Sequence, residues 1–465
     1  MRNFLAAGAV IAAAIAGTAA DNCNGSGQNI NGNWYCEAVK AITYQGVGGS
    51  GSYKKVTNMD SSSGSCSSED YQYSGAMAPL DEEVSFHFRG PLQLKQFAVY
   101  TPSSSSNKKR DVGTSAHHRR HGHQHFHEHN KEIRQIQDEA QKEKREQMVT
   151  ATIDNKVVSW VNNYMVASPT SSAEPSVRVD AAQPSSASAS SSASSSASSS
   201  ASSSSASASA SSTGSSGGSG SWNRQAYYDS SSGTADGLVF LNHFGGSKGS
   251  DGDSSGVWDT SFGNSLSYAS SDGKGGAGHP QVLEDTTLPS NAEVVIMSDK
   301  SCDDGNCGYY RDGTVAYHGF DGAQKAFLFE FGMPDDNSGS GDNANMPAIW
   351  MLNALIPRTL QYGKAECSCW ESGCGEFDIF EVLDSGNTRC KSTFHPAGGD
   401  SDYFERPTQG TIKAAVVFTG SEETAHIKIL DYSTNFDSSL ASSLIQSFTD
   451  DNSDGNGSSL FKLGS

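Results

Sequence analysis

Short hydrophobic runs, separated by clusters of Gly, Ser and Asp, recur along the chain from residue 222 to residue 465. Some alternate apolar and polar positions and others are apolar throughout, as in GLVFLNHF, AEVVIMS, KAFLFEFGM and PAIWMLN. Such runs are typical of strands that are buried on one or both faces. Because no helical periods intervene, the pattern predicts one all-β domain, a sandwich or barrel of about 240 residues.

A second β-rich segment covers residues 21–105. It is rich in Gly, Ser and Tyr and contains the alternating runs EEVSFHFRG and LQLKQFAVY, which predict strands. We therefore expect a small Cys- and Gly-rich β module here, preceding the larger domain.

The two β-rich segments are separated by residues 106–221, whose composition is different. The first part is basic and dense in His, and residues 130–148 have helical composition with little apolar stripe. Seven histidines in HHRRHGHQHFHEH could bind Zn or Cu, or they could belong to an exposed segment with incidental metal affinity. The Ser- and Ala-rich tract from about residue 168 cannot bury a core, which predicts a disordered linker.

The first 20 residues have the pattern of a secretory signal peptide, with cleavage expected between Ala20 and Asp21. A basic KKR motif ending at Arg110 predicts a second proteolytic cut. No later segment is apolar and long enough to span a membrane. Nine cysteines are consistent with an oxidising compartment, and the six that follow residue 300 could pair among themselves, leaving an odd number in the early segment. The sequence thus predicts a secreted protein.

The negative charge lies entirely in the second half of the chain. From Ser221 onward there are 34 acidic and 14 basic residues, and this difference equals the whole net charge of −20. An acidic domain is a poor partner for nucleic acid or an anionic membrane, whereas a neutral polymer such as a glucan is compatible with it. The sequence gives no indication of the oligomeric state.

The strand-like segment CGEFDIFEVLDSG contains three carboxylates, although acidic residues are depleted from strands. On a regular strand Glu376 and Asp378 share one face and Glu381 points to the other. A one-residue bulge near Ile379 and Phe380 would bring Glu381 to the face of the other two acids. Their repulsion would raise at least one pKa, which suits a glycosidase. The alternative is an edge strand with an acidic, solvated face.

Two carboxyl groups of a retaining glycosidase lie about 5–5.5 Å apart. The outer acids of this segment must therefore lean inward over the middle one. The long Glu376 and Glu381 side chains can do so, and the shorter Asp378 fits between them.

The order of motifs around this segment is FLFEFGMP, NMPAIWMLNALIP, CSCWESGCGEFDIFEVL and KSTFHPAG. It resembles glycoside hydrolase family 16, the laminarinase-like β-glucanases with a concanavalin-like β-sandwich, or jelly roll. The resemblance implies that Glu376 is the nucleophile, Glu381 the acid/base, and Asp378 the residue that tunes their protonation. The spacing Glu-x-Asp-x-x-Glu is similar to the laminarinase-like branch, which implies a β-1,3-glucan substrate.

The same resemblance implies substrate-binding residues. Trp350 and Trp370 match aromatic residues that stack on sugar rings, although each could instead be a core residue. His395 matches a histidine on the adjacent strand that faces the substrate cleft. No catalytic cofactor or metal is implied, and whether a structural calcium ion is bound stays open.

Other features differ from common members of that family. Cys367, Cys369 and Cys374 crowd the approach to the acidic strand, and we expect at least two of them to form disulfides with cysteines that follow residue 300. The early β module and the Ser/Ala linker are similar to fungal secreted cell-wall proteins of the Tos type. This resemblance implies a wall-located, retaining endo-β-1,3-glucanase. The alternatives are a β-1,3-glucan transglycosylase and a glucan-binding wall protein without catalysis.

Overall fold

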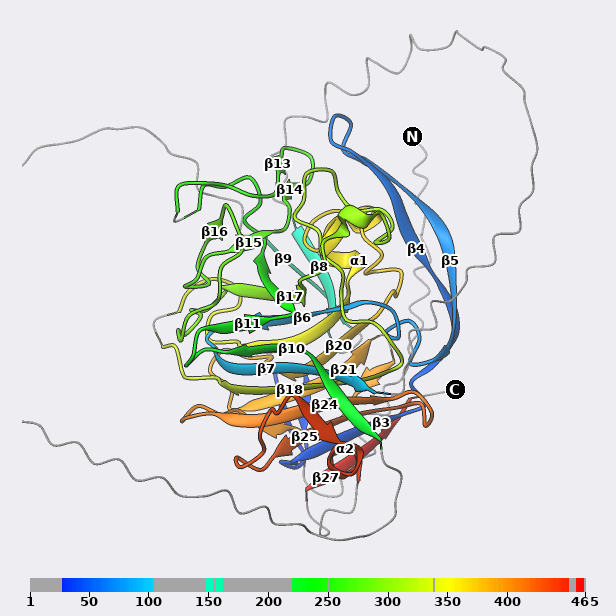
Figure 1. The fold of residues 1–465 in the computed structure, drawn as a ribbon, viewed down its shortest axis with the longest axis vertical. Coiled ribbons are helices and arrows are strands. Elements are labelled where there is room, and N and C mark those ends of the chain that lie inside the picture. Colours follow the sequence, from blue (N-terminus) through cyan, green and yellow to red (C-terminus); the bar gives the residue numbers. More distant parts are fainter. Residues whose placement is uncertain are drawn as a thin grey trace, which may run out of the picture. The chain divides into compact units, whose positions relative to one another are not determined.

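The computed structural model describes residues 27–103, 148–153, 156–161 and 220–463, except 250, 338, 396 and 451–456. In these residues two large sheets face one another as a β-sandwich (Figure 1). The predicted all-β sandwich is therefore confirmed. Helices are few and short in this part of the chain: α1 (Leu355–Thr359), α2 (Ser442–Thr449) and the 3-10 turns η4 (Cys302–Asp304) and η5 (Ala365–Cys367).

The first sheet has nine strands within the described residues. Its order is β11 (Thr234–Asp236), β10 (Ser221–Asp229), β7 (Gln93–Pro102), β18 (Gln324–Gly332), β24 (Ile412–Thr419), β25 (Thr424–Leu430), β3 (Ala41–Gln45) and β27 (Ser458–Lys462), and β26 (Ser439–Ala441) pairs with β10. All pairs are antiparallel except that of β27 with β3.

The second sheet has ten strands, counted over the same residues. Its order is β16 (Gly276–Ala277), β15 (Ser267–Ala269), β12 (Leu238–Asn242), β17 (Glu293–Ser298), β6 (Val84–Arg89), β19 (Ala348–Asn353), β20 (Glu376–Glu381), β21 (Arg389–His395) and β22 (Gly398–Gly399), and β23 (Phe404–Glu405) pairs with β21. This sheet carries the acidic segment on β20.

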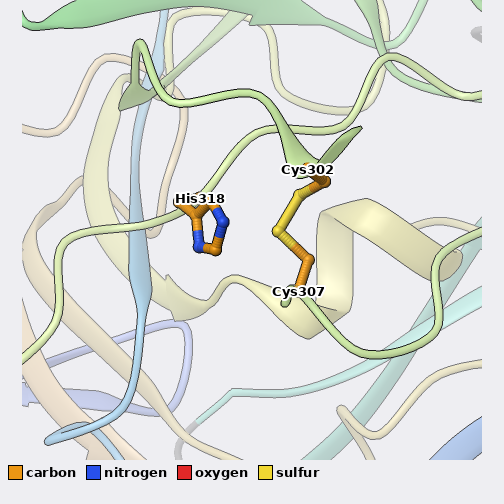
Figure 2. A group of neighbouring side chains, drawn as sticks. All are labelled: Cys302, Cys307 and His318. Carbon is orange, nitrogen blue, oxygen red and sulfur yellow. A yellow bond between two sulfur atoms is a disulfide. The ribbon is translucent and has the colours of Figure 1, made fainter. Parts of the chain in front are cut away.

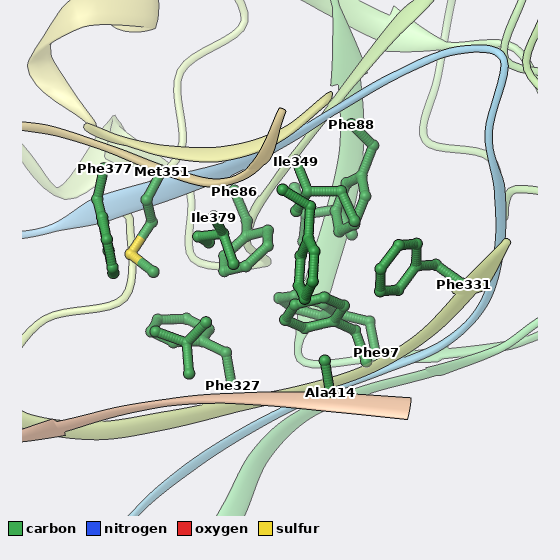
Figure 3. Close-up of a cluster of buried hydrophobic side chains, with 14 of the residues drawn as sticks. Phe86, Phe88, Phe97, Phe327, Phe331, Ile349, Met351, Phe377, Ile379 and Ala414 are labelled. Carbon is green, nitrogen blue, oxygen red and sulfur yellow. The ribbon is translucent and has the colours of Figure 1, made fainter. Parts of the chain in front are cut away.

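The core between the sheets is rich in phenylalanine. Figure 3 shows Phe86, Ile349 and Met351 pointing from one layer toward Phe327 and Phe97 of the other. The rings of Phe86 and Phe97 lie 5.2 Å apart, centroid to centroid. Because side chains alternate along a strand, the residues between these core positions point to the outer face of their sheet.

The N-terminal segment is not a separate module, and this prediction was wrong. The runs EEVSFHFRG and LQLKQFAVY do form strands, β6 and β7, but each lies between strands of the C-terminal half. β6 pairs with β17 and β19, and β7 pairs with β10 and β18. Alternation in a sequence shows which face of a strand is buried and does not show which strands flank it.

A long hairpin, β4 (Gly48–Asp60) and β5 (Ser65–Ala76), belongs to neither large sheet (Figure 1). We call it the arm. Tyr53 of the arm is buried against Trp350 and Leu352 of the second sheet. The disulfide Cys66–Cys367 joins the arm to the loop that precedes β20. Three further two-stranded pairs are β1 (Gln28–Ile30) with β2 (Asn33–Tyr35), β13 (Trp258–Asp259) with β14 (Gly263–Asn264), and β8 (Met148–Ile153) with β9 (Lys156–Val161).

The disulfides bear out one prediction and correct another. Cys369 pairs with Cys374, so two of the three cysteines near β20 pair with late cysteines, as expected. The six late cysteines do not pair only among themselves, because Cys367 pairs with the early Cys66 and Cys390 is a buried free thiol. Spacing along a chain cannot reveal this long-range bond.

Several predictions lie outside the described residues. They are the signal peptide at 1–20, the cut after Arg110, the histidine-dense segment, the Ser/Ala linker and the helix over 130–148, apart from its last residue, Met148, which begins β8. Of the range 106–221, the structure describes β8 and β9, for which no strands were predicted, and the start of β10. In the described part of the chain, no helix has the length and apolar character needed to cross a membrane.

Candidate active site

The acidic strand β20 contains the predicted bulge. Trp350 of β19 is opposite Asp378, but the next residue in register, Ile349, is opposite Phe380, so Ile379 is the extra residue. The ladder with β21 shifts at the same place, between Asp378 and Glu381. As a result Phe377, Ile379 and Phe380 all pack in the core, and the three acids share the outer face.

Glu376 begins β20 beside the disulfide-closed loop. The indole Nε1 of Trp370 donates a hydrogen bond to Glu376 Oε2 at 2.8 Å. Burial and the negative charge of Asp378 raise the pKa of Glu376 to about 7. This carboxyl group therefore takes up a proton far more readily than an exposed glutamate.

Asp378 forms a close ion pair with His395 of β21. The imidazole Nε2 and the Asp378 Oδ2 atom are 2.9 Å apart. Burial alone would lower the pKa of His395, but the carboxylates of Glu376 and Asp378 outweigh it and raise that pKa to about 10. His395 is therefore an imidazolium at neutral pH, and its Nε2–H donates a hydrogen bond to Asp378 Oδ2.

Glu381 ends β20 and lies near Arg89 of β6. Its side chain is 12% exposed, and Oε1 lies 3.6 Å from the guanidinium of Arg89 on β6. Burial and the charge of Asp378 raise its pKa to about 8, and the arginine only partly opposes this. Glu381 therefore holds its proton to a higher pH than an exposed glutamate does.

The two predicted tryptophans lie beside the acids in different environments. Trp350 is directly opposite Asp378 but only 5% exposed, and its ring stacks on that of His87 with centroids 5.0 Å apart. Trp370 is partly buried, and the edge of its ring meets Tyr362 at 6.2 Å between centroids. Trp350 thus has little free surface for a sugar ring, whereas Trp370 has more.

Two residues of this site were missed from the sequence. His87 and Arg89 come from β6, which was assigned to a separate module, yet they flank Trp350 and Glu381. The signal was present in the run SFHFR, where Phe86 and Phe88 are core residues and the polar residues between and after them share the other face.

Two groups of side chains have metal-ligand spacing among the described residues. In the first, Cys302 and Cys307 form a disulfide beside His318, so their sulfur atoms are not thiolate ligands (Figure 2). The second consists of Glu376, Asp378 and His395, each with one ligand atom within 4.8 Å of the others. The ion pair between His395 and Asp378 already engages one of these ligand atoms on each of the two residues.

Two regions of the chain match the two parts of one protein family. Residues 40–102 match the N-terminal part of the family described as cell wall protein YJL171C/Tos1, and residues 220–448 match its C-terminal part. Both matched regions contribute strands to both sheets.

Relatives with similar sequences extend over nearly the whole chain. A protein of Candida albicans named "Probable circularly permuted 1,3-beta-glucanase TOS1" is 42% identical over 443 residues, which cover 88% of this chain and 90% of the relative. A protein of the same name in Saccharomyces cerevisiae is 47% identical, and the match covers 89% of this chain and 90% of the relative. A protein of Arthroderma benhamiae is 41% identical, and the match covers 91% of this chain and 91% of the relative. No solved structure matches the chain significantly. At this identity and coverage, the chain belongs to the Tos1 family of fungal cell wall proteins.

Proposed function

We propose that this protein is a retaining endo-β-1,3-glucanase that acts on cell-wall glucan. The observation that carries the proposal is the bulge at Ile379, which gives one face of a strand three carboxylates. Both outer acids have raised pKa values, as a glycosidase requires of a proton donor near neutral pH.

The different surroundings of the two outer acids support an assignment of roles. Glu376 accepts a hydrogen bond from Trp370 and lies near the cationic His395, and both interactions favour its ionised form. The ionised Glu376 is then the nucleophile, and the protonated Glu381 is the general acid.

The reaction proceeds in two displacements. The Glu376 carboxylate attacks the anomeric carbon, the bond to the glycosidic oxygen breaks, and that oxygen takes the proton of Glu381. In the second step Glu381 removes a proton from water, whose oxygen attacks the same carbon and releases Glu376. Two inversions give net retention of the β configuration.

Asp378 and His395 support both steps without bonding to the sugar carbon. The negative charge of Asp378 raises the pKa of both outer acids. His395 holds the Asp378 carboxylate in place and compensates part of its charge. This pair therefore keeps a proton available on Glu381 at neutral pH.

The names of the relatives support the substrate class, because they are called probable 1,3-beta-glucanases. Their description as circularly permuted is also in keeping with sheets that combine strands from both ends of this chain. A neutral polymer is compatible with the acidic C-terminal half.

The test is incubation with laminarin, a soluble β-1,3-glucan, followed by sizing of the products. Shorter chains are expected, and Glu376→Ala is the matched control that should produce none. Chains longer than the substrate would instead indicate a transglycosylase. Binding of laminarin with unchanged chain length would indicate a glucan-binding wall protein and would overturn the proposal.

A further inference from the structure

A further carboxylate, that of Glu293, is buried on the same outer face, three strands away from β20. Glu293 begins β17, where Val294 and Ile296 point into the core and Val295 points outward with Glu293. The neighbour order β17, β6, β19, β20 puts Glu293 about 14 Å from the acidic strand. A single sugar ring at the reacting bond does not span this distance.

Four side chains converge on this carboxylate, and we call the five residues the Glu293 cluster. His87 Nδ1 and Gln361 Nε2 donate to Glu293 Oε1 at 2.9 and 3.0 Å, and the Tyr362 hydroxyl donates to Oε2 at 2.5 Å. His243 Nε2 lies 3.5 Å from Oε1. So many donors hold the carboxylate and the rings around it in fixed orientations.

The cluster has a buried floor and a partly exposed rim. Glu293 and Gln361 are each only 5% exposed, whereas Tyr362 and His243 are partly exposed. The two rim rings meet at 5.2 Å between centroids, and Tyr362 meets Trp370 at 6.2 Å. Because Trp370 donates to Glu376, a continuous row of rings runs from the reacting acid to His243.

Two polar atoms of the cluster are left without hydrogen-bond partners among the described residues. They are Gln361 Oε1 and His243 Nε2, and the latter contacts Glu293 without hydrogen-bond geometry. Both atoms are buried inside the cluster, so a ligand from solvent would meet the partly exposed rings of Tyr362 and His243 rather than these atoms. A sugar suits such a rim, since its ring face stacks on aromatic side chains.

We propose that the Glu293 cluster is a second sugar-binding subsite, in which the rings of Tyr362 and His243 hold a glucosyl unit remote from the reacting bond. The inference rests on the proposed function for the identity of the sugar. The Tyr362 hydroxyl is already engaged by Glu293, so its ring face is the part that meets the glucan. Longer β-1,3-glucan chains should therefore bind more tightly than short ones.

The test compares laminaribiose with laminarihexaose by calorimetric titration in a Glu376→Gln background, in which neither ligand is consumed. Tyr362→Ala should weaken binding of the hexaose about tenfold and leave the biose unaffected. Tyr362→Phe should keep most of the affinity, because the ring remains although the hydroxyl is lost. Tyr432→Ala is the control, since that residue is 68% exposed and follows β25 of the other sheet.

A purely structural role gives a different result. If Tyr362→Phe and Tyr362→Ala lose affinity equally, the tyrosine acts only through its hydroxyl on Glu293, and the subsite is overturned. Unchanged hexaose affinity in Tyr362→Ala overturns it as well. Thermal unfolding checks that each variant is folded, and His243→Ala, for which a similar loss is expected, replaces Tyr362→Ala if that variant does not fold.

Failure of this inference and failure of the catalytic proposal can be told apart. If the unsubstituted protein cleaves laminarin but Tyr362→Ala binds hexaose normally, only the subsite is wrong. If laminarin is not cleaved but Tyr362→Ala loses length-dependent binding, the subsite stands and the catalytic proposal is wrong.

Discussion

Glu293 and the two outer acids of β20, Glu376 and Glu381, are largely buried carboxyl groups on the same face of one sheet, yet the pKa of Glu293 is lowered and those of the other two are raised. Burial would raise the pKa of Glu293, but the imidazoles of His243 and His87 beside it outweigh burial and hold that pKa well below its usual range. Glu376 has one donor, Trp370, and a negative neighbour, so its pKa rises. Burial alone therefore does not make a carboxyl group reactive, because the number of donors and the charge of the neighbours decide its protonation.

The strongest test of this contrast removes each outer acid in turn. Glu376→Ala should lower the hydrolysis rate about a thousandfold or more, because the covalent step is lost. With an activated aryl glycoside, added azide should give the α-glycosyl azide. Glu381→Ala should spare substrates whose leaving group needs no proton, and azide should then give the β product, because it attacks the glycosyl-enzyme.

The products are identified by NMR of the anomeric proton. If the two azide products are exchanged between the variants, the roles of Glu376 and Glu381 are reversed. Unchanged hydrolysis in both alanine variants would mean that the acidic strand is only a charged face.

A smaller effect is expected from neutralising the middle acid. Asp378→Asn preserves the shape of the side chain but removes the charge that raises the pKa of Glu376 and Glu381. Glu381 should then lose its proton at lower pH, so the alkaline limb of the pH–rate profile should move to lower pH. The maximal rate should fall about a hundredfold, in the range of effects on general acid–base catalysis. Asp431→Asn, on an exposed turn of the other sheet, is the control.

The same contrast predicts opposite effects on stability. Glu293→Gln should lower the free energy of unfolding by about 2 kcal/mol at pH 7, because hydrogen bonds to a charged group are lost. Since the pKa of Glu293 is depressed in the folded state, this loss should be complete above the ordinary value of 4.5 and should shrink as the pH falls below it.

Glu376→Gln should instead stabilise the protein at pH 8, by an amount of order 1 kcal/mol. A carboxyl group with a raised pKa destabilises the folded state once it is ionised, so the gain should grow as the pH rises from 4.5 to about 7. Urea titrations at pH 4, 6 and 8 measure both variants. If Glu293→Gln and Glu376→Gln change the free energy of unfolding in the same direction at pH 8, the contrast between the two carboxyl groups is wrong.

The bulge could be predicted because it follows from the alternation of side chains between the two faces of one short strand. In EFDIFE the last acid is out of step with the first two, and only an extra residue lets all three share a face while the aromatic residues stay in the core. The strand face that each of Glu376, Asp378 and Glu381 occupies can thus be worked out from six consecutive residues.

Arg89 and Glu293 could not be assigned in this way. Each was seen only as a polar residue at the end of an apolar run, and its meaning depends on partners far along the chain, such as Glu381 and Gln361. The interleaving of β6 and β7 with later strands is of the same kind, because strand neighbours are set by tertiary packing that a local pattern does not record.

The pairing of β7 with β10 determines what proteolytic processing after Arg110 would produce. Pro102 is opposite Trp222 in the ladder, and the Ser103 amide donates to the Ser221 carbonyl, so the chain leaves the sandwich and re-enters it at neighbouring points. Cleavage after Arg110 would therefore nick the protein without dividing it into domains. The two resulting polypeptides would share both sheets and stay covalently joined through Cys66 and Cys367. A processed molecule would be a two-chain protein, in which neither chain contains the whole site, since Arg89 belongs to one and Glu381 to the other.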